Sequence, residues 1–288
     1  MLPAASKYTT PKAGRNLPVA IGVGVALLVP VVVGLVWFDW VFIIFVALLL
    51  SLAVVEVSRA MRLKGMHAET VPIMIGTVVS IVGGYWVTAL PSEHISAMTF
   101  IVTCLGATVL ASFIARLFRG GADGFIRDVA ASAFIITYIP LIGVFVALLM
   151  SPDNGSQRIW SILMCVVLSD TGAYATGVLF GKHKMAPSIS PSKTWEGLAG
   201  SLIWSGTAGA AAAIWLLEMD WWVGIIFGVL VSLAASVGDL TESLIKRDAG
   251  IKDMSSWLPG HGGIMDRLDS MLMAFPVGWF VLNLAMGS

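Results

Sequence analysis

The feature that most constrains this chain is a recurring apolar run of about 20 residues, the length at which a helix crosses the hydrocarbon core of a bilayer. Between charged or turn-rich stretches, nine such runs can be read, at 18–38, 40–57, 71–91, 95–115, 125–150, 158–180, 197–217, 221–241 and 264–286. Backbone groups left unpaired in lipid are costly, so runs of this kind are expected to be helical. The sequence therefore predicts an all-α polytopic membrane protein with about nine transmembrane helices.

The composition excludes a water-soluble globular protein. Hydrophobic residues make up 58% of the 288 positions and charged residues only 12%, whereas a soluble domain carries about 25% charged residues. Cys104 and Cys165 both fall inside apolar runs, and we expect them to be small buried side chains without a disulfide. In the fifth run, Pro140 follows Tyr138 and Ile139, and a kink is expected there.

The basic residues predict the orientation of the chain. Nine spans create ten flanking segments, which lie alternately on the two sides of the membrane. Of the 17 Lys and Arg residues, 16 lie on the side of the N-terminus, and Arg158 alone lies on the other side. Cytoplasmic segments retain Lys and Arg in this way. We therefore expect a cytoplasmic N-terminus and an external C-terminus.

The same alternation suggests a division of the chain into three parts. We expect residues 1–17 to be a cytoplasmic tail, 18–150 to form N-terminal transmembrane helices, and 151–288 to form a C-terminal catalytic region. Within that region, 181–196 and 242–263 are predicted to be long cytoplasmic loops. The first apolar run is longer than the core of a signal peptide and lacks a persuasive cleavage site, so we expect it to be retained.

Four carboxylates lie inside or at the edge of apolar runs, where charge is expensive and usually functional. Asp170 lies midway along the sixth run, and Asp239 lies near the inner end of the eighth. Asp266 and Asp269 open the ninth, one helical turn apart and so on one face. A structural hydrogen bond between helices is the alternative interpretation, and it is strongest for Asp170.

Carboxylates near a water-accessible membrane surface, with basic residues around them, are typical of a Mg²⁺ site that handles phosphates. Mg²⁺ takes one or two carboxylates and keeps its other positions for water and substrate phosphates. Lys and Arg neutralise the remaining phosphate charge. These residue types suit phosphoryl or nucleotidyl transfer, which depends mainly on positioning and charge stabilisation. The four histidines are dispersed, which disfavours a zinc site.

The stretch SISPSKTWEG, Ser188 to Gly197, can be interpreted in two ways. Ser190, Ser192, Lys193 and Thr194 at the start of a helix could cradle a phosphate, because free N–H groups and the helix dipole favour anions. The simpler alternative is an N-cap by Ser192 or Thr194, with Glu196 completing a loose capping box.

The stretch PGHGG before the last apolar run carries a similar ambiguity. Gly262 and Gly263 either form a plain turn or let the backbone approach a phosphate. His261 is a candidate phosphate contact or a proton donor or acceptor, and the phosphate contact is the preferred interpretation.

Residues 243–269 resemble the signature of the phosphatidate cytidylyltransferases, also called CDP-diacylglycerol synthases. They read S-x-I-K-R-x4-K-D-x-S-x2-L-P-x-H-G-G-x-x-D-R-x-D, which fixes more than a dozen positions. The upstream stretch SDTGAYATGVLFGKHKMAPSISPSKTWEG is similar to a second region of the same family. Ser192 departs from the pattern, because many members have a second Lys there. The resemblance covers about the C-terminal 40% of the chain.

The resemblance implies a reaction in which CTP and phosphatidate give CDP-diacylglycerol and pyrophosphate for phospholipid biosynthesis, with Mg²⁺ and with K⁺ as a possible second cation. It also implies a homodimer in the cytoplasmic membrane, with the active site on the cytoplasmic side, and no nucleic-acid partner. By motif position, Asp239 and Asp266 would bind the metal. We expect Asp269 to support the metal site or to orient Arg267, and Asp170 to join or stabilise it.

The basic residues of the two regions are the predicted contacts to the triphosphate or the lipid phosphate: Lys193, Lys246, Arg247, Lys252, His261 and Arg267. Two other kinds of protein share part of this pattern. A polyprenyl-phosphate sugar-phosphate transferase also combines many spans with inner-face aspartates, and an ion-coupled transporter could use Asp170 and Asp239 as ion sites. A CDP-alcohol phosphotransferase is disfavoured, because its characteristic aspartate spacing is absent.

Overall fold

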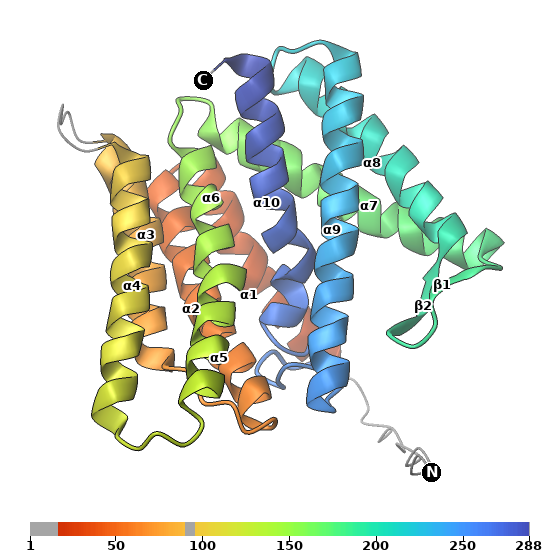
Figure 1. The fold of residues 1–288 in the computed structure, drawn as a ribbon. Coiled ribbons are helices and arrows are strands. Elements are labelled where there is room, and N and C mark those ends of the chain that lie inside the picture. Colours follow the sequence, from red (N-terminus) through yellow and green to blue (C-terminus); the bar gives the residue numbers. More distant parts are fainter. Residues whose placement is uncertain (1–16, 90–95, 288) are drawn as a thin grey trace.

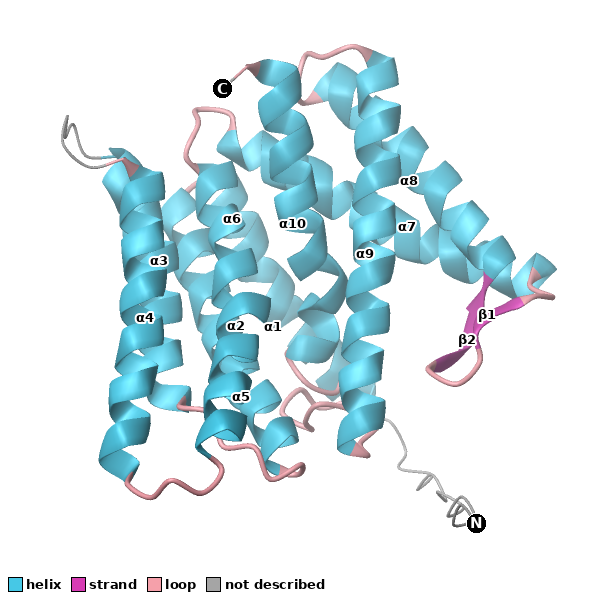
Figure 2. Cartoon of the chain, in the orientation of Figure 1, coloured by secondary structure: helices cyan, strands magenta, loops and turns pink. Residues whose placement is uncertain are grey.

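The computed structural model describes residues 17–89 and 96–287 and is a bundle of helices with one small β-ribbon (Figures 1 and 2). The predicted N-terminal tail lies outside the described residues, except for Leu17. The elements are α1 (Leu17–Val36), α2 (Asp39–Arg62), α3 (Thr70–Ala89), α4 (Ala97–Arg119), α5 (Phe125–Tyr138), α6 (Pro140–Met150), α7 (Gly155–Phe180), β1 (Lys184–Ala186), β2 (Ser190–Thr194), α8 (Trp195–Trp215), α9 (Trp221–Ala249) and α10 (Met265–Met286).

The prediction of a polytopic membrane protein is confirmed. Within the described part of the chain, eight helical segments are long and apolar enough to cross a membrane, and the first apolar run forms a shorter helix of the same character. The predicted kink is also confirmed, because the helix breaks at Ile139 between α5 and α6, and Pro140 opens α6. Proline fits the first turn of a helix, where its missing N–H is not needed.

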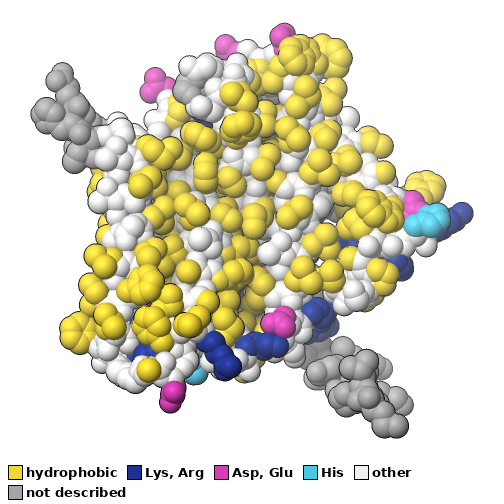
Figure 3. Space-filling view, in the orientation of Figure 1, with side chains coloured by type: hydrophobic (Ala, Val, Ile, Leu, Met, Phe, Trp, Pro, Cys, Tyr) yellow, Lys and Arg dark blue, Asp and Glu magenta, His cyan; other side chains and the backbone are white. Residues whose placement is uncertain are grey.

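Loops from distant parts of the sequence meet at one end of the bundle, the lower end in Figure 1. Lys64, after α2, donates to Asp248 at the end of α9, with an Nζ–Oδ1 distance of 3.0 Å. The guanidinium of Arg59 lies 4.7 Å from the ring centroid of Trp257, in the loop between α9 and α10. In Figure 3, Lys and Arg side chains gather along this end, where some Asp and Glu also lie, and further Asp and Glu appear at the opposite end. The predicted separation of basic residues between the two ends is therefore present in the fold.

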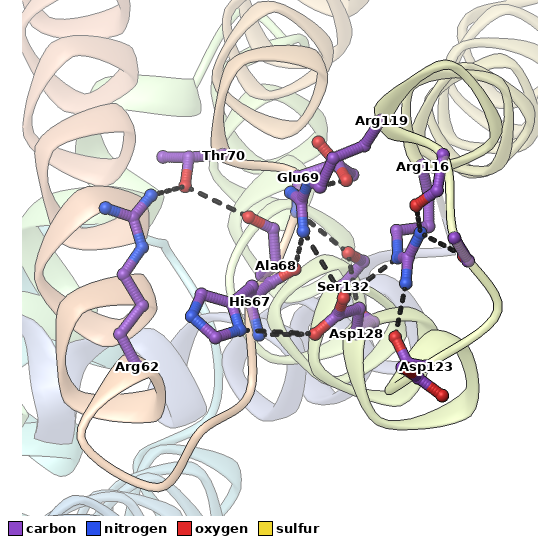
Figure 4. Close-up of polar contacts among 12 residues, drawn as sticks. Arg62, His67, Ala68, Glu69, Thr70, Arg116, Arg119, Asp123, Asp128 and Ser132 are labelled. Atoms are coloured by element: carbon purple, nitrogen blue, oxygen red, sulfur yellow. Dashed lines mark hydrogen bonds and ion pairs between the residues drawn. The ribbon is translucent and has the colours of Figure 1, made fainter.

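A buried ion network ties α4, α5 and the loop before α3 together at the same end (Figure 4). Asp128 of α5 accepts from Arg116 of α4 at 2.8 Å and from the backbone N–H of His67 at 2.7 Å. Arg119 bridges Asp128, at 3.3 Å, and Glu69, at 2.5 Å. Arg116 and Asp128 are both almost fully buried. Each charge is satisfied by partners, as burial requires, and this network fixes the loop at 63–69 against α4 and α5.

Two of the predicted loops have more regular structure than expected. Helix α9 does not end near residue 241 but continues to Ala249, so Lys246 and Arg247 are helical and the following loop covers only 250–264. The predicted loop 181–196 contains the antiparallel strands β1 and β2, with Lys184 opposite Thr194. The ribbon projects beyond the tips of α7 and α8 (Figure 2).

Helices α8 and α9 approach each other through glycines. A Cβ on Gly209 would lie 2.1 Å from the carbonyl oxygen of Gly224, and a Cβ on Gly228 would lie 2.0 Å from that of Ser205. Small residues let helix backbones come close in a membrane, where the hydrophobic effect does not drive helix association. The hydroxyl of Ser205 donates to the carbonyl of Gly228 at 2.7 Å. This close crossing fixes α9, which carries much of the candidate site.

Candidate active site

Glu56 of α2 holds the start of α10 in place. Its carboxylate is fully buried and accepts from the backbone N–H of Ile264 at 2.9 Å and of Met265 at 2.7 Å. It also accepts from the hydroxyl of Ser255. The first N–H groups of a helix lack partners within the helix, and a carboxylate there also interacts favourably with the helix dipole. A residue from the N-terminal half of the chain thus positions the α9–α10 loop (250–264).

Two glycines let the loop turn tightly beside these carboxylates. Gly262 has φ +84°, a backbone conformation that other residues rarely adopt. A Cβ on Gly263 would lie 2.8 Å from an oxygen of Glu56 and 2.9 Å from one of Asp266. Gly263 instead donates its N–H to Asp266 at 2.7 Å. The HGG sequence therefore forms a turn whose backbone closely approaches two carboxylates.

Asp266 lies at the centre of a buried charged group between α9 and α10. One of its oxygens accepts from Lys246 at 2.8 Å, and the other accepts from the backbone N–H of Met254 at 3.0 Å as well as from Gly263. Lys246 also forms an ion pair with Glu242, one helical turn earlier. The Glu242 carboxylate is completely buried, and the ammonium of Lys246 is its ion-pair partner.

Asp239 lies on the same face of α9 as Glu242 and Lys246, since these residues are three and seven positions apart. It forms an ion pair with Lys193 of β2, with a separation of 2.5 Å. The hydroxyl of Ser243 lies 3.5 Å from the other oxygen of Asp239. The ribbon therefore reaches α9 through Lys193. Neither Asp239 nor Asp266 lacks a counter-ion, although the sequence offered no obvious one.

Asp269 and Asp170 complete the group. A Cβ on Gly238 would lie 2.2 Å from the carbonyl oxygen of Asp269, so the backbones of α9 and α10 are in close contact at this point. The charges of Asp269 and Asp170 both interact repulsively with that of Asp239. Asp170 also interacts with the ammonium of Lys193. Carboxylates from α7, α9 and α10 are thus grouped at the basic end of the bundle.

This carboxylate cluster, defined here as Asp170, Asp239, Glu242, Asp266 and Asp269, carries more negative charge than its lysines balance. Five carboxylates face two ammonium groups, those of Lys193 and Lys246. Carboxylates that are partly withdrawn from water and incompletely paired suit a divalent cation. In the described ranges, no three such side chains form a ready-made metal cage, but Mg²⁺ needs only one or two carboxylates when substrate phosphates and water supply its other ligands.

In the predicted phosphate cradle, one hydroxyl caps a helix and two others do not. The Thr194 hydroxyl caps α8 by accepting from the N–H of Gly197 at 3.0 Å, as the simpler interpretation required. Glu196 does not complete a capping box, because its carboxylate accepts from the backbone N–H and the ring of His183. Ser190 and Ser192 lie on β2, where their hydroxyls are 3.5 Å apart. Arg247 donates to the carbonyl of Ile189 at 3.2 Å and links the ribbon turn to α9.

Three predicted site residues point elsewhere. Arg267 donates twice to the carbonyl of His261, at 2.9 and 2.6 Å, so Asp269 does not orient it as expected. The ring of His261 lies near Gly24 of α1, 3.9 Å from the position of a Cβ there. Lys252 is exposed in the α9–α10 loop. Arg267 lies on the face of α10 opposite Asp266 and Asp269, because successive helical residues are about 100° apart.

Two of the buried acids were not predicted. Glu56 stands inside the run LLLSLAVVEVSRAM, and Glu242 stands between Asp239 and Lys246. Glu56 could have been found by the rule that a charge inside an apolar helix is usually functional. Glu242 could have been found by its spacing of four from Lys246, which places the two side chains together on a helix.

Comparison with known proteins gives one consistent match. The model of the cytidylyltransferase family matches residues 19–285. The phosphatidate cytidylyltransferase of Mycobacterium bovis is 39% identical over 283 residues, which cover 96% of this chain and 91% of the relative. Its namesake from Mycobacterium leprae is 38% identical over 294 residues, or 97% and 91% of the two chains.

A more distant relative supports the same assignment. The phosphatidate cytidylyltransferase of Staphylococcus saprophyticus is 37% identical over 196 residues, covering 67% of this chain and 70% of the relative. The family match extends over the N-terminal helices as well as the signature region. This chain belongs to the cytidylyltransferase family.

Proposed function

We propose that this protein is a phosphatidate cytidylyltransferase, which transfers the cytidylyl group of CTP to phosphatidate and releases pyrophosphate. The names of its relatives support this reaction. The structural observation that carries it is the grouping of carboxylates from α7, α9 and α10 with Lys193 and Lys246 at the basic end of the bundle. The match to the cytidylyltransferase family favours nucleotidyl transfer over sugar-phosphate transfer and over ion transport.

The chemistry needs no strong general base. A phosphate oxygen of phosphatidate is already ionised at neutral pH and attacks the α-phosphorus of CTP. A new P–O bond forms, the bond from the α-phosphorus to the bridging oxygen breaks, and the electron pair leaves with pyrophosphate. The work of the protein is then to position two anions and to neutralise the departing charge. Lys193 and Lys246 are the closest described cations to the cluster and suit this role.

Asp239 and Asp266 are the proposed ligands of Mg²⁺, which would supply charge neutralisation and orientation of the phosphates when bound. Each carboxylate now contacts a lysine, at 2.5 and 2.8 Å. Metal binding to either aspartate would weaken that ion pair and leave the ammonium group available to a phosphate. Glu242, Asp269 and Asp170 would add negative charge around the cation, and a K⁺ ion could balance part of it.

The substrate contacts proposed for the ribbon and the α9–α10 loop follow from their position beside the cluster. Ser190 and Ser192 lie on the ribbon that Arg247 links to α9, and Gly263, next to Gly262, contacts Asp266 directly. Lys252 and His261 lie in the same loop. The hydroxyl of Thr194 is used by its helix cap, so its contribution would be to orient Lys193 rather than to bind phosphate.

The basic end of the bundle is proposed to face the cytoplasm, with the N-terminus on that side and the C-terminus outside. Basic residues favour the cytoplasmic side, and a lipid phosphate lies at the headgroup plane where CTP can reach it. We also propose a homodimer. Helix α4 is the least buried of the eight long described spans, and it exposes apolar residues such as Val102, Leu110 and Phe113. A second copy of the protein would cover this surface.

The direct test uses purified protein, phosphatidate, labelled CTP and Mg²⁺, with CDP-lipid and pyrophosphate as the measured products. Asp239→Asn and Asp266→Asn should each lower kcat by at least about 100-fold, because removal of one stabilising charge at a transferring phosphate commonly has that effect. Asp153→Asn, in a loop at the other end, is the control. Formation of no CDP-lipid by folded wild-type protein would refute the function, whereas near-normal turnover by either variant would refute that ligand assignment.

A further inference from the structure

A second region of the molecule has the properties of a ligand site and is not used by the proposed reaction. It is a partly open cavity of about 790 Å³ lined mainly by α1, α2, α7 and α10. Sites for small molecules occupy roughly 300–1,000 Å³, so this space is large enough for a ligand. Leu28, Phe45, Leu49, Leu163 and Met271 are among the apolar side chains that line it.

The cavity lies on the opposite side of α10 from the carboxylate cluster. It is lined by Leu268, Met271 and Phe275 of α10 and by Ile264 just before the helix, and this spacing of three or four positions defines one face of the helix. Asp266 and Asp269 lie on the other face, against α9. A ligand in the cavity is therefore separated from the carboxylates by the body of α10.

Arg267 is the single charged residue among those that line the cavity. It lies in the first turn of α10, at the basic end of the bundle, so the charged end of the cavity is at the depth of the lipid headgroups. Two of its five N–H groups donate to the carbonyl of His261, and the guanidinium has three more to offer. The ring of His261 lies beside the same opening, near Gly24 of α1. An apolar cavity with a guanidinium at its headgroup end is complementary to one acyl chain and an anionic headgroup.

Helix α1 forms the outer wall of this cavity. Its side chains are mostly exposed or half-buried in the described structure, in contrast to the largely buried face of α2. A wall held by few buried side chains offers a lateral path for a lipid from the surrounding bilayer.

We propose that this cavity binds a membrane phospholipid with an anionic headgroup, at a site distinct from the reaction centre, with one acyl chain between α1, α2, α7 and α10 and the headgroup phosphate at Arg267. The proposal does not depend on the reaction assigned above, because it rests on the shape, lining and charge of the cavity. The ligand class is set by the guanidinium at one end and by the apolar walls along the rest.

The test uses the full-length protein in detergent, with phosphatidylglycerol and phosphatidylcholine as probes and native mass spectrometry as the measurement. We expect one retained phosphatidylglycerol, held more tightly than phosphatidylcholine. Leu49→Trp, which takes up part of the cavity, should weaken retention at least about tenfold, because a change of one methylene in a hydrophobic pocket already alters binding by roughly tenfold or more. Leu48→Trp is the matched control, since the neighbouring Leu48 is 53% exposed and faces outward. Arg267→Gln should remove the preference for the anionic headgroup.

A second measurement uses the unmodified protein and so does not depend on the folding of any variant. Phosphatidylglycerol with a photoreactive group in its acyl chain should label α2, α7 and α10 of the unmodified protein, and unlabelled phosphatidylglycerol should reduce that labelling. Equal retention by the wild type and by folded Leu49→Trp would overturn the proposal. So would labelling that spreads over the exposed face of α4 without competition, or equal binding of the two lipids by the wild-type protein.

Discussion

At the scale of single residues, the site is notable for side chains that restrain one another. Lys193 contacts Asp239, and Lys246 contacts both Asp266 and Glu242. Glu56 is restrained differently, since its partners are N–H and O–H donors of the α9–α10 loop. The lysine pairs would have to exchange partners when phosphates and a cation bind, whereas the contacts of Glu56 would remain. Mutation should therefore affect these two groups of residues in different ways.

Lys193→Gln should strengthen metal binding in the absence of nucleotide. Loss of the ammonium group frees Asp239, and an ion pair of this partly exposed kind is worth up to about 1 kcal/mol, or roughly fivefold in affinity. The measurement is binding of Mn²⁺, as a paramagnetic substitute for Mg²⁺, to the purified protein. Lys184→Gln, on the neighbouring strand, should leave Mn²⁺ affinity unchanged. Weaker binding by Lys193→Gln would show that the lysine does not compete for the proposed ligand.

Glu56→Gln should reduce both stability and turnover. One carboxylate oxygen becomes an NH₂ donor that faces backbone donors, and a buried group left without a partner costs about 1–3 kcal/mol. The α9–α10 loop should then move relative to Asp266, and we expect kcat to fall at least about tenfold. The measurements are thermal unfolding in detergent and initial rates at saturating CTP.

The role of Glu56 is best separated from a general loss of stability by comparison with Ser255→Ala. That change removes one donor from the same carboxylate but keeps both backbone contacts, so its effect on kcat should be smaller. If Glu56→Gln retains normal kcat while it unfolds at a lower temperature, Glu56 stabilises the fold but does not position the loop for catalysis.

At the scale of the secondary-structure elements, apolar length predicted where helices lie but not where each one ends. The apolar pattern predicts that the eighth helix ends at residue 241, whereas α9 extends to Ala249. Glu242 and Lys246 end the apolar run, yet they favour the helix because they pair one turn apart. The strands of the β-ribbon have only three and five residues. Its two prolines interrupt the alternation of apolar and polar residues by which a strand is predicted. Its formation depends on pairing between segments rather than on a local pattern.

Close packing of α8 against α9 should be sensitive to a single methyl group. In Gly228→Ala, the new Cβ would lie 2.0 Å from the carbonyl oxygen of Ser205, so the two backbones must separate, at a cost of about 1–3 kcal/mol. Gly22→Ala in α1 is the matched control, because nothing lies within 4 Å of its Cβ. Thermal unfolding should show a lower midpoint for Gly228→Ala alone. Equal midpoints would mean that this crossing has room to adjust.

At the scale of the whole molecule, the charge pattern, the fold and the cluster are mutually consistent. The carboxylates that the sequence singled out come from three helices that meet at the basic end, as expected for a site between soluble CTP and a lipid phosphate. The sequence could not show how the site is held, because Glu56 is about 200 positions from the loop that it restrains. Helical spacing alone separates Arg267 from Asp266 by about 100°, but the sequence could not show that Arg267 donates to the carbonyl of His261. Motifs therefore identified the region, and helix packing determined which residues meet.

The orientation of the bundle can be tested independently of activity. In a background of Cys104→Ala and Cys165→Ala, single cysteines replace Ser256 in the α9–α10 loop or Asp153 in the loop between α6 and α7, both of which are exposed. If basic residues hold their end of the bundle in the cytoplasm, a membrane-impermeant maleimide should label Asp153→Cys in intact spheroplasts, and Ser256→Cys only after permeabilisation. The reverse pattern would place the carboxylate cluster on the outer surface, where cytoplasmic CTP cannot reach it, and would therefore contradict the proposed reaction as well as the orientation.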